Sequence, residues 1–135
     1  MNTKVLALDF GLKRTGIAIS DEMKMIASGL KTVDSKQLMH ELKFLIPSES
    51  VDTLVIGEPK FTDGTPMQLE KNILFLIEDI QSLFPEIKIV RMDERFTSKM
   101  AFQTMIDSGL KKKKRRNKAL VDEISATILL QNHLQ

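Results

Sequence analysis

The sequence predicts an α/β fold with a five-stranded mixed sheet, in which an antiparallel three-stranded meander precedes parallel strands and helices flank the sheet. Two apolar runs, residues 4–9 and 15–20, are separated by a short glycine-containing turn, which favours an antiparallel hairpin. Strand and helix patterns then alternate along the chain, and this order requires crossover connections between parallel strands. The length of 135 residues, of which 42% are hydrophobic, suits one domain over residues 1–135.

The meander is completed by a third strand, predicted over residues 25–33. The helix that follows is expected to begin at Asp34, because Gln37 stands three residues later and completes a capping-box pattern. Apolar residues recur at helical spacing from there to Pro47, which is expected to end the helix.

In the second half of the chain, segments with the two-residue apolar period of strands alternate with segments that have the 3.6-residue period of helices. Thr65, Pro66 and Gln68 give a cap, a proline at the first helical position and a box partner, so a helix is expected to start there. The predicted elements are strands over 51–57 and 87–91, and helices from Thr65 to Phe84, from Thr97 or Ser98 to Gly109, and from Lys118 to His133.

Composition restricts the chemistry and the location. The chain contains no cysteine, which rules out disulfides and thiolate metal sites and fits a reducing compartment. Its start resembles no secretion signal, and no run reaches the roughly 18 apolar residues of a membrane span, so a cytoplasmic protein without a membrane partner is expected. The basic run KKKKRR, residues 111–116, is expected to form an exposed loop.

Acidic residues stand where three predicted strands end. Asp9, Glu58 and Glu94 occupy these positions, and the carboxyl ends of parallel strands meet at one edge of a sheet. Asp122 on the last helix can point at Asp9 if that helix packs over the first strand, with the small residues Ser125 and Ala126 allowing a close approach. Carboxylates without His or Cys form an all-oxygen site that suits Mg²⁺ or Mn²⁺.

Each acid also has a purely structural interpretation. Asp9 alone can accept hydrogen bonds from the following turn, Glu94 can form an exposed ion pair with Arg95, and Asp122 can be an acid favoured by the helix dipole. Only their joint placement favours a catalytic metal site over these alternatives.

Four stretches carry a resemblance to a known family: LDFGLKRTGIAISD (8–21), LVIGEPKFTDGT (54–65), MDERFTSKMA (92–101) and NKALVDEISATILL (117–130). In their order and spacing the chain resembles the YqgF or RuvX family of pre-16S rRNA nucleases, earlier classed as Holliday junction resolvases. The resemblance implies a ribonuclease H-like fold and an acidic catalytic triad.

The triad falls on Asp9, Glu94 and Asp122, which would hold Mg²⁺ or Mn²⁺. Glu58 stands where the family usually has an apolar residue and is a further candidate ligand.

The implied function is a metal-dependent endonuclease that processes the 5′ end of pre-16S rRNA and leaves a 3′-hydroxyl. A DNA junction resolvase would use the same chemistry, because phosphate contacts do not read sequence. The cations expected to bind phosphates are Lys13, Arg14, Arg95, Lys112, Lys114, Arg116 and Lys118.

Two other classes stay open. The opening strand, DFG and hairpin also fit a nucleotide-binding module of the actin-like type, although a second domain and a second glycine-rich loop are missing. A ribosome-assembly factor that binds RNA without cleaving it is the other alternative. The oligomeric state, monomer or homodimer, is left open by the sequence.

Overall fold

The computed structural model describes residues 2–95, 100 and 117–135. Its strands are β1 (Lys4–Phe10), β2 (Arg14–Ser20), β3 (Ala27–Asp34), β4 (Val51–Glu58) and β5 (Lys88–Asp93). Its helices are the 3₁₀ turn η1 (Ser35–Gln37), α1 (Leu38–Ser48), α2 (Leu69–Leu83) and α5 (Lys118–Leu134). The predicted helix from Thr97 or Ser98 to Gly109 and the basic run 111–116 lie outside the described residues.

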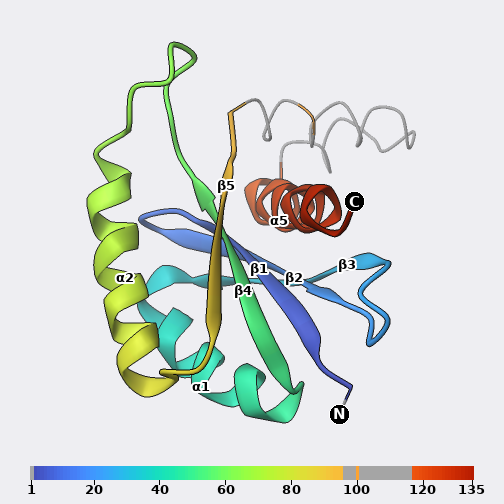
Figure 1. The fold of residues 1–135 in the computed structure, drawn as a ribbon. Coiled ribbons are helices and arrows are strands. Elements are labelled where there is room, and N and C mark those ends of the chain that lie inside the picture. The colour runs from blue at the N-terminus through green and yellow to red at the C-terminus, as the bar shows by residue number, and fades with distance from the viewer. Residues whose placement is uncertain (1, 96–99, 101–116) are drawn as a thin grey trace.

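The five strands form one sheet in the order β3-β2-β1-β4-β5 (Figure 1). The β1–β2 and β2–β3 pairs are antiparallel, whereas β4 pairs in parallel with both β1 and β5. This confirms the predicted mixed sheet. The short turn between β1 and β2 permits only an antiparallel pair, while α1 and α2 supply the crossovers that parallel neighbours need.

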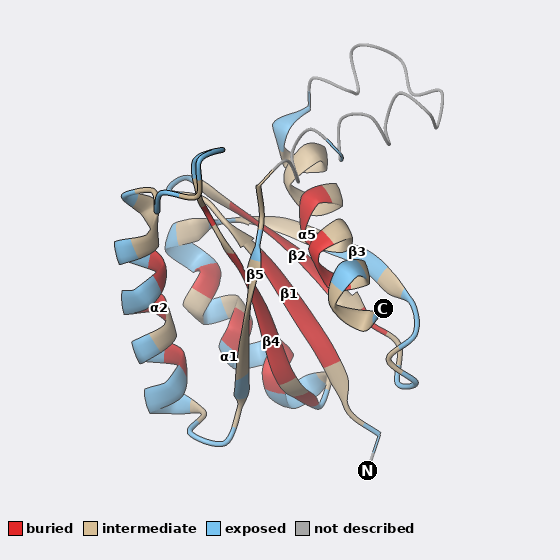
Figure 2. Ribbon diagram, turned by 45° about the horizontal axis from the view of Figure 1, so that its top comes forward, coloured by how far each residue is buried: buried red, intermediate tan, exposed pale blue. Residues whose placement is uncertain are grey.

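Each face of the sheet is covered by different helices (Figures 1 and 2). One face packs on α1 and α2 through a core that includes Leu6, Leu8 and Ile56. The opposite face packs on α5 through smaller residues, among them Ala7 and Ala18. Because side chains alternate along a strand, these two cores fix the face on which every strand residue lies.

Two helix starts differ from the prediction. The segment after Asp34 forms the 3₁₀ turn η1 first, and α1 begins only at Leu38 and ends at Ser48, with Pro47 in its last turn. The second helix begins at Leu69 because Thr65 belongs to a separate turn, in which its carbonyl accepts a hydrogen bond from Phe61 N at 2.8 Å. Within the described part of the chain, no helix has both the length and the apolar character needed to cross a membrane.

Candidate active site

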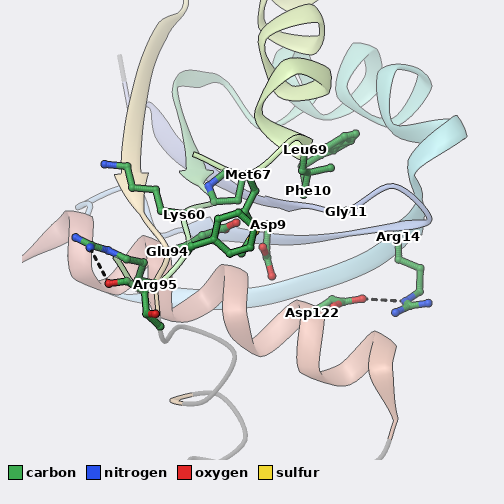
Figure 3. A pocket seen from close by; sticks show the side chains of 13 residues that line it. Asp9, Phe10, Gly11, Arg14, Lys60, Met67, Leu69, Glu94, Arg95 and Asp122 are labelled. Atoms are coloured by element: carbon green, nitrogen blue, oxygen red, sulfur yellow. Dashed lines mark hydrogen bonds and ion pairs between the residues drawn. The ribbon is translucent and has the colours of Figure 1, made fainter. Parts of the chain in front are cut away.

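A pocket of about 520 Å³ lies at the edge of the sheet where β1, β4 and β5 end, beside α5 (Figure 3). Asp9, Glu94 and Asp122 all line it. Asp9 is the second-last residue of β1 and lies on the α5 face, two residues after Ala7. Glu94 follows β5 directly and is held there by a hydrogen bond from its amide to the Glu58 carbonyl at 3.2 Å. The predicted convergence of strand ends thus brings Asp9 and Glu94 into one pocket.

Asp9 and Glu94 share a hydrogen bond between their carboxyl groups. Burial, followed by the charge of Asp9 and the hydrogen bond to Asp9, raises the pKa of Glu94 to about 9. Burial also raises the pKa of Asp9 to about 6; the hydrogen bond from Glu94 lowers it and the charge of Asp122 raises it. At neutral pH the shared proton therefore resides on Glu94, which donates to Asp9.

The side chain of Glu94 fits closely between β4 and α5. A Cβ atom on Gly57 would overlap Oε2 of Glu94 and would lie 3.1 Å from Cδ1 of Leu129, so only glycine leaves room here. Oε2 is buried and has no hydrogen-bond partner among the described residues. A buried carboxylate oxygen without a donor is costly unless a cation balances it, so the donor set of Asp9 and Glu94 suits a hard divalent ion.

Asp122 is placed differently from the prediction. The α5 backbone at Asp122 rests on Gly16 of β2, where a Cβ atom would overlap the Asp122 carbonyl. Its carboxylate accepts a hydrogen bond from Nε of Arg14 at 2.9 Å, and Figure 3 shows it turned toward that guanidinium. Within residues 2–95, 100 and 117–135, no three His, Cys, Asp or Glu side chains lie close enough together to hold one metal ion. Two of the three predicted acids are thus in contact, and the third is ion-paired beside them.

Glu58 lies away from this group. Gly57 faces α5, so the next residue along β4 points to the opposite face of the sheet. There Glu58 forms an ion pair with Lys60, with Nζ and Oε1 2.8 Å apart. Glu58 is not among the residues that line the pocket.

Among the residues that the structure describes, three cations line the pocket: Arg14, Lys60 and Arg95. The guanidinium of Arg95 is paired with Asp93, 2.6 Å away, and not with Glu94. Of the other cations predicted to bind phosphates, Lys13 and Lys118 are exposed, whereas Lys112, Lys114 and Arg116 lie outside the described residues.

Lys60 was not singled out by the sequence reasoning, although its place two residues after the β4 strand end is the signal that marks it.

Arg91 is a further residue that sequence reasoning missed. Its guanidinium donates to both carboxylate oxygens of Glu70 in α2, at 2.8 and 2.6 Å, and to the carbonyls of Ile56 and Gly57 at 3.2 and 3.0 Å. The positive charge lowers the pKa of Glu94, against the larger effect of burial. Arg91 thus ties the first turn of α2 to the end of β4. A single arginine inside the apolar pattern IKIVRMD is the sequence signal.

The raised pKa of Glu94 predicts how stability depends on pH. An ordinary Glu titrates near 4.5 and Glu94 near 9, so between these values the native state binds more protons than the unfolded chain. The contribution of Glu94 to stability is therefore complete below pH 4.5 and is lost as the pH rises toward 9.

We expect Glu94→Gln to remove this dependence. In EDTA, the melting temperature of the wild type relative to Glu94→Gln should fall steadily from pH 5 to pH 9, as followed by circular dichroism. Parallel curves for the two proteins would show that Glu94 titrates normally.

Comparison with solved structures defines the class of the protein. Thermus thermophilus RuvC, solved in complex with a Holliday junction substrate, superposes with a TM-score of 0.59 at 13% sequence identity, covering 98% of this chain and 93% of that chain. At this identity the likeness shows the fold, which is ribonuclease H-like. This fold carries carboxylates at the ends of its parallel strands, and the family of the chain and its nuclease-named relatives make the protein a phosphodiester-cleaving hydrolase.

The chain belongs to the RuvX family, whose model, described as Holliday junction resolvase, matches residues 3–135. A protein of Christiangramia forsetii is 56% identical over 97% of both chains, and it carries the name "Putative pre-16S rRNA nuclease". Proteins of Flavobacterium johnsoniae (52% identical, 97% of this chain and 95% of that one) and Bacteroides thetaiotaomicron (45%, 98% and 96%) carry the same name. The predicted fold and the predicted family are both confirmed.

Proposed function

We propose that the chain is a metal-dependent endonuclease that processes the 5′ end of pre-16S rRNA, with residues 1–135 acting as one nuclease domain. The substrate is supported by the names of relatives at 45–56% identity over nearly their whole length. The site is supported by one observation above all: two half-buried carboxyl groups are in contact at the strand ends, and the buried Oε2 of Glu94 has no hydrogen-bond partner among the described residues. A cytoplasmic location is part of the proposal, because bacterial rRNA precursors mature there.

Asp9, Glu94 and Asp122 are the residues that would hold the divalent ion. Mg²⁺ or Mn²⁺ bound there would lower the pKa of a bound water and neutralise the charge that develops on the cleaved phosphate. The side chains must supply both negative charge and a dry environment. The raised pKa values of Asp9 and Glu94 reflect the dry environment, and the negative charge would come from displacement of the proton that they share.

Binding of the metal requires Glu94 to lose the proton that it shares with Asp9. The pKa of about 9 means that this proton is released only when a cation replaces it. Metal affinity should therefore rise with pH through the neutral range. The same pocket presents Arg14, Lys60 and Arg95, whose charges can hold phosphates on either side of the cleaved bond.

DNA junctions are the second candidate substrate. The family description, Holliday junction resolvase, favours them. The chemistry at the acids would be unchanged, and only the contacts around the pocket would differ.

A cleavage assay tests the proposal. A pre-16S rRNA fragment that spans the 5′ end, a mature-end control and a four-way DNA junction would each be incubated with protein in Mg²⁺, Mn²⁺ or EDTA. The proposal expects cleavage of the precursor, dependence on the metal, and products with a 3′-hydroxyl. Preferred cleavage of the junction would favour the resolvase. RNA binding without cleavage in either metal would support the assembly-factor alternative.

A further inference from the structure

Asp122 lies between the acidic pair of Asp9 and Glu94, whose charge repels its carboxylate unless a cation is bound, and the guanidinium of Arg14, which attracts it. Its backbone rests on Gly16 of β2, and Gly16 is the register partner of Asp9 on β1. Arg14 precedes Gly16 by two residues on the same strand and therefore lies on the same face of the sheet. The carboxylate of Asp122 thus has the acidic pair on one side and a guanidinium on the other.

The structure shows the carboxylate on the side of the guanidinium. Nε of Arg14 donates to Oδ2 of Asp122 at 2.9 Å, and the two side chains are 35% and 25% exposed. The ion pair is open to solvent from the pocket that both residues line (Figure 3). A pair with this exposure contributes little free energy, so a stronger partner for either residue can break it.

A nucleic-acid phosphate is such a partner for Arg14. Phosphate offers two oxygens to the guanidinium at once, and bidentate, charge-assisted bonds of this kind are stronger than a single bond through Nε. Released from Arg14, the Asp122 side chain would be free to turn toward Asp9, since its backbone rests on Gly16, the register partner of Asp9.

We propose that Arg14 couples nucleic-acid binding to metal binding: in the free protein it holds Asp122 away from Asp9 and Glu94, and a phosphate that takes Arg14 releases Asp122 to complete the metal site. The coupling rests on the proposed function of the site. By thermodynamic linkage it acts in both directions, so metal that takes Asp122 also makes Arg14 available to phosphate.

Mn²⁺ affinity of the nucleic-acid-free protein gives the first test, measured from the free Mn²⁺ signal in electron paramagnetic resonance. Arg14→Gln should tighten Mn²⁺ binding about three- to fivefold, the range expected for loss of a half-exposed competing ion pair. Lys36→Gln removes the same charge from an exposed position in η1, beside the same turn, and should change the affinity far less. In an Asp122→Asn background the gain from Arg14→Gln should disappear.

RNA affinity in EDTA gives a second test that involves no metal. Asp122→Asn should tighten binding of an RNA oligonucleotide by a similar factor, because the Arg14 guanidinium then has no competing carboxylate and can bind a phosphate. Glu123→Gln removes the neighbouring charge and serves as the matched control. In the Arg14→Gln background, Asp122→Asn should give no more gain than Glu123→Gln does.

The outcomes separate this coupling from the function on which it rests. If Asp9→Asn leaves Mn²⁺ affinity unchanged, the ion binds elsewhere, and the proposed site and the coupling both fail. If Asp9→Asn weakens Mn²⁺ binding but Arg14→Gln does not tighten it, the site stands and the coupling is overturned. If the effects of Arg14→Gln and Asp122→Asn are additive in both double-mutant cycles, the coupling is also overturned. The ion pair would then only hold β2 and α5 together.

Discussion

Asp9→Asn should reduce cleavage of the precursor RNA by about a thousandfold or more while the protein still folds. Asparagine keeps the shape of the side chain but cannot supply the negative charge that a divalent ion requires. The substitution also removes a buried acid whose pKa is raised to about 6, so at pH 8 it relieves the cost of an ionised buried group. In EDTA the variant should therefore melt no lower than the wild type.

The response of the melting temperature to Mg²⁺ should also differ between the wild type and Asp9→Asn. Mg²⁺ should raise the melting temperature of the wild type by mass action and leave that of Asp9→Asn nearly unchanged. Glu58→Gln is the matched control: it alters an acid at a neighbouring strand end that is paired with Lys60 and does not itself line the pocket. Glu58→Gln should keep most of the activity and the full Mg²⁺ response. An Asp9→Asn protein that unfolds at ambient temperature would instead assign Asp9 a structural role as a turn cap.

Gly16→Ala should lower the free energy of unfolding by about 1–3 kcal/mol and reduce activity about a hundredfold. The added Cβ would overlap the carbonyl of Asp122 and lie 2.9 Å from the amide nitrogen of Glu123. Both are backbone atoms, so α5 itself must move away from the sheet. Alanine suits a strand better than glycine does, so any loss of stability comes from this displacement and not from strand propensity. Urea unfolding and single-turnover cleavage measure the two effects.

Gly29→Ala is the control for Gly16→Ala. The Cβ at Gly29 would meet side-chain atoms of Glu123, Oε1 at 2.5 Å and Cγ at 2.8 Å, and no backbone atom is among its three nearest neighbours. The side chain can swing into solvent, so stability should change by only about 0.5 kcal/mol and activity hardly at all. Equal effects at the two glycines would show that the distance between α5 and β2 does not control the site.

Much of the fold can be predicted from turn lengths and from the local periodicity of apolar residues in the sequence. The turn between residues 10 and 14 is too short for anything but an antiparallel pair, and the alternation of helix and strand periods after it requires parallel crossovers. The same reasoning places Asp9 and Glu94 at strand ends on the same edge of the sheet. The start of α2 was predicted too early because Thr65 and Pro66 serve a turn as well as they would serve a helix cap, and only the contact with the preceding loop decides between these roles.

The sequence by itself determined the sheet, its family and the acids that its strands carry to one edge. The tertiary structure alone decided how those acids act on one another. Burial against α5 and the narrow space beside Gly57 put the shared proton on Glu94, and pleating turned Glu58 to the other face. The packing of α5 on Gly16 brought Asp122 to Arg14, a residue 108 positions away. Spacing along a chain fixes which residues share an element, but pKa values and ion pairs depend on distances and burial that arise only when separate elements pack.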